Sequence, residues 1–376
     1  MQPDFPADPQ RAEDFRINLL RWYKKNHRSL PWRATGDPYA IWISETMLQQ
    51  TQVATVIPYF QRWLTLFPTV RDLAEAPLDD VLQAWQGLGY YSRARNLHKA
   101  AQQIVANHDG VFPGNYDDVL ALPGVGRYTA GAVCSIALGL DTPIVDANVV
   151  RVLCRVFGIH GDPKGGEAQA ALWRLATELI PSGDAGTFNQ AMMELGALVC
   201  ATPPKCDGCP VRSECYAFDT GAPSALPEFA PKPDFTTQTD VSAIVMDGDE
   251  KLLLIRRPLD AGLWAGLWEL PRVTAEAEET PGAAACRAIR EAVGIEDAKA
   301  VEITPLGKVR HGVTTRKITL LGIAVSIGGM VTPSDKAAWA TTQEALDGYA
   351  LASPQRRLIE QIAERRRAAV VQPTLF

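Results

Sequence analysis

The sequence contains no apolar run approaching the roughly 20 residues that a membrane-spanning helix requires. Its first residues, MQPDFPADPQ, lack the charged and then apolar order of a secretion signal. It also lacks an excess of basic residues, because the net charge is −6, and this argues against a protein that coats nucleic acid through its overall field. We therefore expect a cytoplasmic protein whose contacts with any polyanion depend on local basic groups.

The length of 376 residues with 47% hydrophobic content predicts two domains. Residues 1–220 show repeated helical periodicity and almost no strand alternation, which predicts an all-α domain. The first helix is expected after Asp8-Pro9, with aspartate as the N-cap. The other expected helices are 38–49, a segment from 51, 78–85, 90–108, 115–121, 127–138, 147–157, 166–179 and 184–199.

Residues 221–234 contain four prolines and no periodicity, which indicates a linker. After it, the pattern predicts an α+β domain over 235–366. A hairpin is expected from 240–246 and 251–258, at least one long strand within 309–327, and helices at 282–293 and from Ser353-Pro354. Residues 367–376 form a short tail.

The segment Leu122–Arg127 lies between two expected helices, and its glycines leave backbone N–H groups open to an anion. Such a turn can hold a DNA phosphate without reading sequence, although packing is the simpler explanation for a lone Gly-x-Gly. Asp146 follows at the start of a later helix, where it could be an N-cap, a functional carboxylate or both.

LPGVGRYTAGAV followed by PIVDANVVRVLCR resembles the helix-hairpin-helix glycosylase superfamily. The resemblance implies that Gly124, Val125 and Gly126 bind DNA phosphate, that Asp146 faces the sugar of an extruded nucleotide, and that Asn148 contacts the substrate. Breaking a purine N-glycosidic bond builds positive charge on the deoxyribose, which a carboxylate beside the sugar stabilises.

A leaving adenine must be protonated by a general acid with a raised pKa. SETMLQQTQV is similar to the segment of MutY-type adenine glycosylases that carries the catalytic glutamate, which implies this role for Glu45. Apolar neighbours, Trp42 and Met47 among them, are expected to raise its pKa by desolvation. A helical glutamate in an arbitrary protein is more often a surface charge.

The resemblance continues along some 200 residues. It implies adenine-pocket roles for Arg28, Leu30, Trp32, Arg33 and Gln190, and contacts with the oxidised guanine or the duplex for Gln49, Gln50, Thr51, Leu88, Gly89 and Tyr90. A glycosylase must extrude its base to reach the glycosidic bond, so the duplex has to be opened. Tyr128 stands where strand-cleaving relatives have lysine. Because a phenol cannot form a Schiff base, we expect base excision without efficient strand cleavage.

Four of the seven cysteines, Cys200, Cys206, Cys209 and Cys215, fall within sixteen residues, which indicates metal ligation in a cytosolic protein. Zinc sites usually show two close Cys pairs, and this loop has one. The loop looks like the [4Fe-4S] loop of the superfamily, except that its first gap is five residues rather than six.

The second domain resembles the Nudix-like module with which MutY-type enzymes recognise 8-oxoguanine, and GLWAGLWELPR carries the clearest match. Its helix lacks the paired glutamates that hold metal in Nudix hydrolases, so nucleotide hydrolysis is not expected. The lesion-recognition loop is also altered, to Val313, Thr314 and Thr315. Thr314 can still donate a hydrogen bond through its hydroxyl.

Two other functions are compatible with parts of the pattern: a glycosylase for thymine mismatches or oxidised pyrimidines, and a damaged-DNA binding module without chemistry. The Nudix-like module argues against the first, and the presence of both Glu45 and Asp146 argues against the second. The tail resembles a peptide that binds the bacterial sliding clamp, through Gln372, Leu375 and Phe376, although a frayed terminus is the simpler interpretation. We expect a monomer.

Overall fold

A computed structural model describes residues 9–231, 233–301 and 304–371. The chain divides into two compact units, residues 1–75 with 96–231, and residues 76–95 with 232–376. Among the described residues, no helix is both long and apolar enough to cross a membrane. The tail residues 372–376, including the clamp-type peptide, lie outside the described residues.

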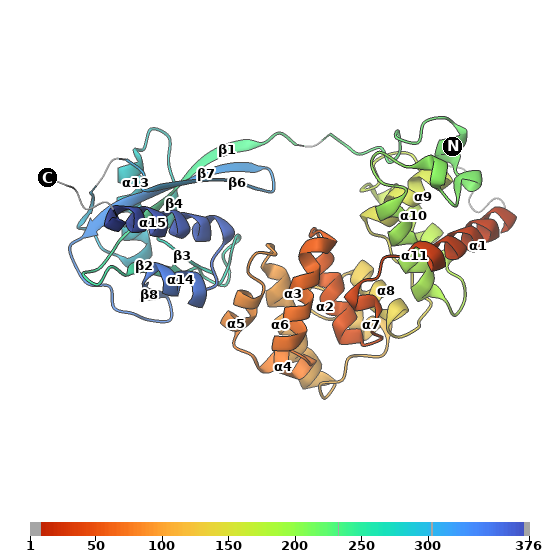
Figure 1. The fold of residues 1–376 in the computed structure, drawn as a ribbon, viewed down its shortest axis with the longest axis horizontal. Coiled ribbons are helices and arrows are strands. Elements are labelled where there is room, and N and C mark those ends of the chain that lie inside the picture. The colour runs from red at the N-terminus through yellow and green to blue at the C-terminus, as the bar shows by residue number, and fades with distance from the viewer. Residues whose placement is uncertain (1–8, 232, 302–303, 372–376) are drawn as a thin grey trace. The chain divides into compact units, whose positions relative to one another are not determined.

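The first unit is helical (Figure 1). The helices before residue 232 are α1 (Pro9–Asn26), α2 (Pro38–Leu48), α3 (Val53–Leu66), α4 (Val70–Glu75), α5 (Leu78–Ala84), α6 (Ser92–Asn107), α7 (Tyr116–Leu120), α8 (Arg127–Ile136), α9 (Ala147–Phe157), α10 (Gly166–Leu179), α11 (Ala185–Leu198) and α12 (Tyr216–Asp219). Of these, α5 and the first residues of α6 belong to the second unit. Short 3-10 turns are η1 (Pro31–Arg33), η2 (Cys206–Gly208) and η3 (Arg212–Glu214).

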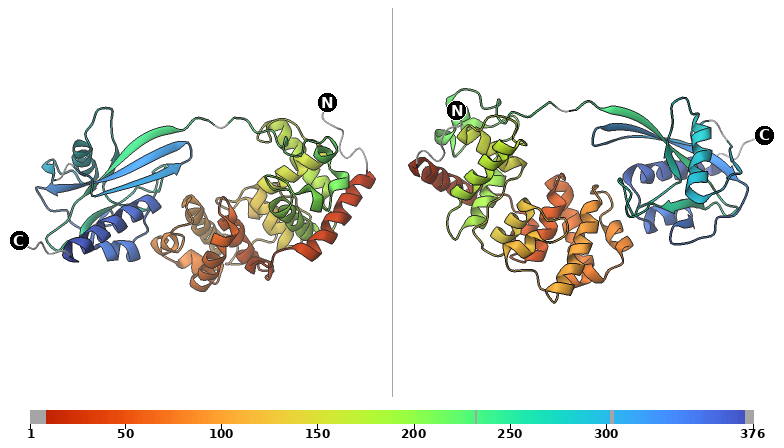
Figure 2. Two further views of the ribbon diagram at one scale, coloured as in Figure 1. Left: turned by 45° about the horizontal axis from the view of Figure 1, so that its top comes forward. Right: turned by 180° about the vertical axis from the view of Figure 1, so that it is seen from behind.

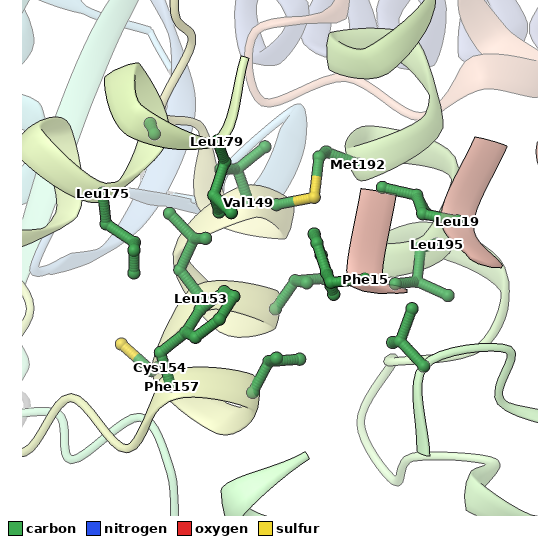
Figure 3. Close-up of a cluster of buried hydrophobic side chains, with 14 of the residues drawn as sticks. Phe15, Leu19, Val149, Leu153, Cys154, Phe157, Leu175, Leu179, Met192 and Leu195 are labelled. Atoms are coloured by element: carbon green, nitrogen blue, oxygen red, sulfur yellow. The ribbon is translucent and has the colours of Figure 1, made fainter. Parts of the chain in front are cut away.

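The main core of this unit forms where α1, α9, α10 and α11 pack together (Figure 3). Phe15 of α1 meets Phe157 of α9 edge-to-face, with ring centroids 5.4 Å apart, and Phe188 of α11 at 6.4 Å. Leu153 and Leu195 are fully buried in the same cluster. Because Asp146 is the N-cap of α9, this packing fixes the position of that carboxylate.

The expected helices are present, with differences that have local causes. The helix expected from residue 90 begins at Ser92, because Tyr90 has a φ of +47° and lies outside helical geometry. The short helix α4 was not predicted. The expected N-cap Asp8 lies outside the described residues.

From residue 233 on, the described part of the second unit contains two sheets and three helices. The strands are β1 (Thr236–Ile244), β2 (Leu252–Arg256), β3 (Trp268–Glu269), β4 (Arg272–Thr274), β5 (Ala298–Ala300), β6 (Gly307–Val313), β7 (Arg316–Ile327) and β8 (Ala337–Ala340). The helices that follow β4 are α13 (Pro281–Val293), α14 (Thr342–Gly348) and α15 (Ser353–Val371).

The larger sheet has the order β4-β1-β7-β5, with β6 also paired to β7, and the smaller sheet has the order β3-β2-β8. The hairpin expected from 240–246 and 251–258 forms only beside its turn. Met246 and Leu252 form an antiparallel bridge there, and the Leu253 N–H donates to the Val245 carbonyl at 3.0 Å. Farther from the turn the two segments pair with different partners. The alternation of apolar residues located both strands, but their partners lie far away in sequence.

Helices cover both faces of the larger sheet (Figure 2). Ile289 of α13 packs with Val241 and Ile323 on one face, and Leu358 of α15 packs with Val309 and Leu320 on the other. Helix α15 ends at Val371, so the first residues of the expected tail are helical.

Candidate functional site

Glu45 lies on α2, a helix that is buried along almost its whole length. The Asp37 carboxylate caps its start by accepting from the Tyr39 N–H at 3.0 Å, and Pro38 occupies the first turn. Glu45 itself is only 4% exposed. Burial raises the pKa of its carboxyl to about 7, an effect that a Tyr128 hydrogen bond and the Arg33 charge oppose and that the Asp146 charge reinforces.

Tyr128, in the first turn of α8, donates its O–H to Glu45 Oε2 at 2.5 Å. Burial and the neighbouring carboxylates raise the pKa of this phenol well above its usual value, so it stays protonated and acts as a donor. Its oxygen also lies 3.4 Å from Met193 Sδ. The structure therefore joins two residues that are 83 positions apart in sequence into one hydrogen-bonded pair.

Asp146 is the N-cap of α9, and its Oδ1 accepts from the Val149 N–H at 2.7 Å. Its Oδ2 accepts from Asn148 Nδ2 at 2.9 Å. Burial raises the pKa of this carboxyl, although both hydrogen bonds and the Arg151 charge oppose the shift. The capping role and a functional role are thus both available to the same side chain, because the cap holds the carboxylate at the positive end of α9.

Glu194 is a buried carboxylate that was not among the predicted site residues. It accepts from Arg28 at the backbone N–H (2.8 Å), Nε (2.9 Å) and Nη2 (2.8 Å), and from Arg33 Nη2 at 2.8 Å. These bonds hold the pKa of Glu194 at about 2, against the desolvation that burial imposes. Two arginines predicted in one apolar pocket imply a buried counter-charge, and Glu194 lies in the segment NQAMMELG beside the predicted Gln190.

A cavity of about 510 Å³ brings these side chains together within the first unit. Leu30, Trp32, Ile41 and Ile136 contribute apolar wall, and the volume is in the range of small-molecule sites. Predicted residues that line it are Arg28, Leu30, Trp32, Arg33, Glu45, Gln49, Gln50, Thr51, Tyr128, Asp146, Asn148 and Gln190, and Glu194 and Met193 line it as well. Leu88, Gly89, Tyr90 and the residues 124–126 and 313–315 do not.

The Leu122–Arg127 turn joins α7 to α8 with Gly124 at a φ of +77°. A Cβ there would lie 2.5 Å from the Asn96 Cβ, so glycine is required on steric grounds as well. Gly126 is the N-cap of α8 and offers no capping side chain. The first N–H groups of α8 are therefore available to an anion.

Three of the predicted DNA contacts share an uncommon backbone conformation. Gln50, Tyr90 and Thr314 have φ values of +58°, +47° and +51°, and they are three of the seven non-glycine residues in the described chain with positive φ. Such conformations are energetically unfavourable and concentrate at functional positions. Tyr90 is also 54% exposed.

Cys200, Cys206, Cys209 and Cys215 all line one small cavity, with Arg155 beside them. Burial is the main cause that raises the pKa of Cys209 to about 12, and the charges of the other three cysteines add to it. Arg155 donates from Nη1 to Cys200 Sγ at 3.3 Å and to the Cys200 carbonyl at 3.0 Å. In the described chain no three His, Cys, Asp or Glu side chains converge on a single-ion site. A four-iron cluster does not need such convergence, because each thiolate binds its own iron.

Arg151 connects this loop to the cavity of Glu45 and Asp146. Its Nε donates to the Cys200 carbonyl at 2.7 Å, and its Nη2 donates to Asn148 Oδ1 at 2.9 Å. Asn148 in turn donates to Asp146. Arg151 was not among the predicted site residues, although helical spacing places it on the same α9 face as Asn148.

In the second unit, the helix that corresponds to the expected Nudix-type segment is α13. Arg287 of this helix binds Glu279 through Nε (3.0 Å) and Nη2 (2.7 Å), and Glu291 through Nη1 (2.9 Å). One guanidinium thus binds both carboxylates and offsets one of their two negative charges. Thr314 lies at the turn between β6 and β7, where its hydroxyl donates to the Val313 carbonyl at 2.7 Å.

Comparison with known proteins gives two family matches. Residues 43–178 match the HhH-GPD superfamily of base excision DNA repair proteins, and residues 241–361 match the NUDIX domain. The chain is 39% identical to the adenine DNA glycosylase of Mus musculus over 386 residues, covering 88% of this chain and 74% of that protein. It is 38% identical to that of Homo sapiens, covering 88% and 70%. Among solved structures, a thermostable thymine-DNA glycosylase superposes with a TM-score of 0.52 at 31% identity, covering 56% of this chain and 98% of that one.

Proposed function

Because the chain belongs to the MutY-type adenine DNA glycosylases of base excision repair, we propose that it removes adenine mispaired with 8-oxoguanine or guanine, without efficient strand cleavage. The family hydrolyses the N-glycosyl bond of adenine in DNA. Our proposal for this chain adds the base opposite the adenine and the absence of efficient strand cleavage.

The observation that carries the chemistry is the common cavity of Glu45, Tyr128 and Asp146. With a pKa of about 7, Glu45 holds a proton in a large fraction of molecules at neutral pH, so it is matched to a general acid. It protonates a ring nitrogen of adenine as the bond to the sugar breaks. Asp146, which carries negative charge beside it, stabilises the cationic sugar until water adds.

Tyr128 orients the acid through its hydrogen bond to Glu45 Oε2. Since its pKa is raised, the phenol is a donor rather than a nucleophile. An amine at this position could attack the sugar and form a Schiff base, which leads to strand scission. Tyr128 therefore supports base release alone.

Adenine is held by the apolar walls of Leu30 and Trp32 and by polar groups that include Gln190 and the Arg28–Glu194 pair. The Gly124–Gly126 turn and the start of α8 bind a phosphate, which positions the duplex without reading its sequence. Gln50 and Tyr90 enter the opened duplex, and Thr314 contacts the lesion through its hydroxyl.

The family commonly carries a [4Fe-4S] cluster, and the four-cysteine cavity fits one. Cys200, Cys206, Cys209 and Cys215 would hold it, and its role would be to order the loop between α11 and α12. Hydrolysis needs no electron transfer. Zinc in the same four thiolates is the competing assignment, and metal analysis of anaerobically purified protein separates the two.

Gln372, Leu375 and Phe376 are proposed to bind a sliding clamp as a short peptide. Adenine opposite 8-oxoguanine arises at replication, so attachment to the clamp would bring a monomeric enzyme to new DNA. Calorimetry with the cognate clamp tests this, comparing the full chain with a Leu375→Ala/Phe376→Ala variant. Equal affinities would contradict the proposal.

One assay tests the central proposal: single-turnover cleavage of duplexes with A:8-oxoguanine, A:G, A:T and G:T pairs, with and without alkali. We expect product from the first two only, and strand breaks only after alkali. Cleavage of G:T instead of A:8-oxoguanine would favour the thymine-directed alternative. Breaks without alkali would contradict the monofunctional assignment.

A further inference from the structure

A second cavity, of about 890 Å³, lies on the larger sheet of the second unit. It is formed by the outer halves of β1, β6 and β7 and by the loop 275–281 that leads into α13. Thr237, Thr239, Val241 and Ala243 lie on one face of β1. Val241 and Ala243 pack under α13, whereas Thr237 and Thr239 extend past that helix and are exposed. The cavity is therefore the part of the face that α13 leaves uncovered.

Strand register arranges the residues of this face in two rows. In the first row Lys317 is paired with Gly312 on one side and Thr237 on the other. In the second row Thr319 is paired with Arg310 and Thr239. Because alternate residues of a strand share one face, all six point to the same side. We call these six residues, Thr237, Thr239, Arg310, Gly312, Lys317 and Thr319, the basic strip.

The basic strip presents positive charge and hydroxyl donors together. Arg310 and Lys317 are exposed, and neither forms an ion pair with a carboxylate of the described chain. Lys317 Nζ lies 5.2 Å from the centroid of the Phe235 ring, which is 54% exposed. A cation beside an exposed aromatic ring, with hydroxyl groups around it, is the chemistry that proteins use toward nucleic-acid backbones.

The carboxylates at the cavity edge do not cancel this charge. Glu279 accepts two hydrogen bonds from Arg287, which hold the pKa of its carboxyl at about 2. Glu276 lies 3.9 Å from the same guanidinium. Arg287 offsets one of these two negative charges. Arg287, Arg310 and Lys317 together therefore exceed Glu276 and Glu279 by one positive charge, although the whole chain carries −6.

We propose that the basic strip binds the sugar–phosphate backbone of DNA next to the lesion. Arg310 lies on β6, three residues before Val313, and Lys317 lies on β7, two residues after Thr315. These two strands carry the lesion-recognition turn. A strand whose phosphates lie on the strip would present its base to Thr314. That the strip binds DNA next to the lesion rests on the proposed function, whereas its contact with the DNA backbone does not.

The test uses salt dependence in the full chain. Each lost phosphate contact lowers the slope of log K against log salt by about 0.9 and weakens binding about tenfold at 0.1 M salt. Arg310→Gln/Lys317→Gln is therefore expected to lower the slope by about two, on A:8-oxoguanine and on undamaged A:T duplexes alike. Excision at saturating enzyme should be unchanged, because both residues lie outside the cavity of Glu45.

The matched control is Arg290→Gln/Lys299→Gln, which removes the same charge from two exposed residues of this unit that lie outside the strip. Its slope should equal that of the wild type. Equal slope changes in both variants would mean a general field effect and would overturn the proposal. A further variant, Thr319→Val, should weaken binding without changing the slope, since it removes a neutral donor.

Two further measurements distinguish binding of the DNA backbone from binding of a free nucleotide and from recognition of the lesion. Calorimetry with dGTP should show no binding; binding that requires Arg310 and Lys317 would assign the cavity to a free nucleotide and overturn the proposal. The A:T duplex isolates the strip from the proposed function. A slope loss on A:T supports the strip even if the wild type fails to prefer 8-oxoguanine, and an unchanged slope refutes it even if excision proceeds as expected.

Discussion

Glu194 accepts three hydrogen bonds from Arg28, one from the backbone N–H and two from the guanidinium. The side chain of Glu194 is 1% exposed and that of Arg33 is 13% exposed, whereas that of Arg28 is 36% exposed, so the ion pairs are buried on the side of the carboxylate. Removing one partner of a fully buried pair typically costs about 3–5 kcal/mol, and solvent contact of Arg28 lowers that cost here.

We therefore predict that Glu194→Gln lowers the free energy of unfolding by about 2 kcal/mol, measured by urea denaturation at pH 7. Glu75→Gln is the control, because Glu75 is exposed and lies 3.7 Å from Arg71 in a surface pair. That variant should change stability by less than about 1 kcal/mol. Similar small losses for both would show that Glu194 does not hold the two arginines.

The pKa of Glu45 predicts the alkaline limb of excision. Because the acid form donates the proton, the single-turnover rate should fall about tenfold for each pH unit above about 7. Glu45→Gln should abolish release while mismatch binding persists, since the group acts in the transition state. A rate that is flat between pH 6 and 9 would contradict this role.

Tyr128→Phe should shift that limb upward. The Tyr128 hydrogen bond stabilises the Glu45 carboxylate and lowers its pKa, so its removal raises the pKa and extends activity to higher pH. Tyr39→Phe is the matched control, because it removes a buried hydroxyl that donates to the Phe67 carbonyl. A downward shift in Tyr128→Phe, or the same shift in both variants, would refute the assignment.

Asp146 is predicted to separate chemistry from capping. Asp146→Asn keeps a side-chain oxygen for the Val149 N–H, whereas Asp146→Ala removes the cap and should cost about 1 kcal/mol of stability. Both should lose adenine release, because neither carries charge beside the sugar. Calorimetric melting and single-turnover assays measure the two effects. Release by Asp146→Asn at the wild-type rate would leave Asp146 as a helix cap only.

Cys209→Ser should lose about four irons per chain and the broad absorption near roughly 400 nm, if the loop holds a [4Fe-4S] cluster. Cys154→Ser is the control, because Cys154 is buried in the helical core and lines no part of the cysteine cavity. Stoichiometric zinc without iron in the wild type would replace the cluster with a zinc site.

Local sequence patterns predicted where the helices of the site begin, but not which residues of different helices contact one another. The Asp37-Pro38 start of α2 and the Asp146 start of α9 both follow from capping rules, because a cap is a contact between residues close in sequence. The resemblance supplied Glu45 and Tyr128, whose hydrogen bond spans the two helices α2 and α8. No periodicity could have predicted that contact.

Long-range pairing explains what was missed. Glu194 lies 166 residues from Arg28, so its role becomes visible only when α11 packs near the segment after α1. The long-range partners of β1 and β2 were missed for the same reason, since β1 pairs with β7 across some 80 residues. The basic strip likewise exists only after β1, β6 and β7 come into register.

The buried carboxyl of Glu45 also limits how much loss of folding free energy the protein can tolerate from substitutions elsewhere. Raising its pKa from an ordinary 4.5 to about 7 removes roughly 3 kcal/mol of folding free energy, lost progressively as pH rises from 4.5 to 7. Domains have only about 5–15 kcal/mol in total. A substitution in the α1–α9–α10–α11 core that costs about 1–2 kcal/mol would therefore deplete the folded protein in a cell several-fold while every purified molecule remained chemically competent.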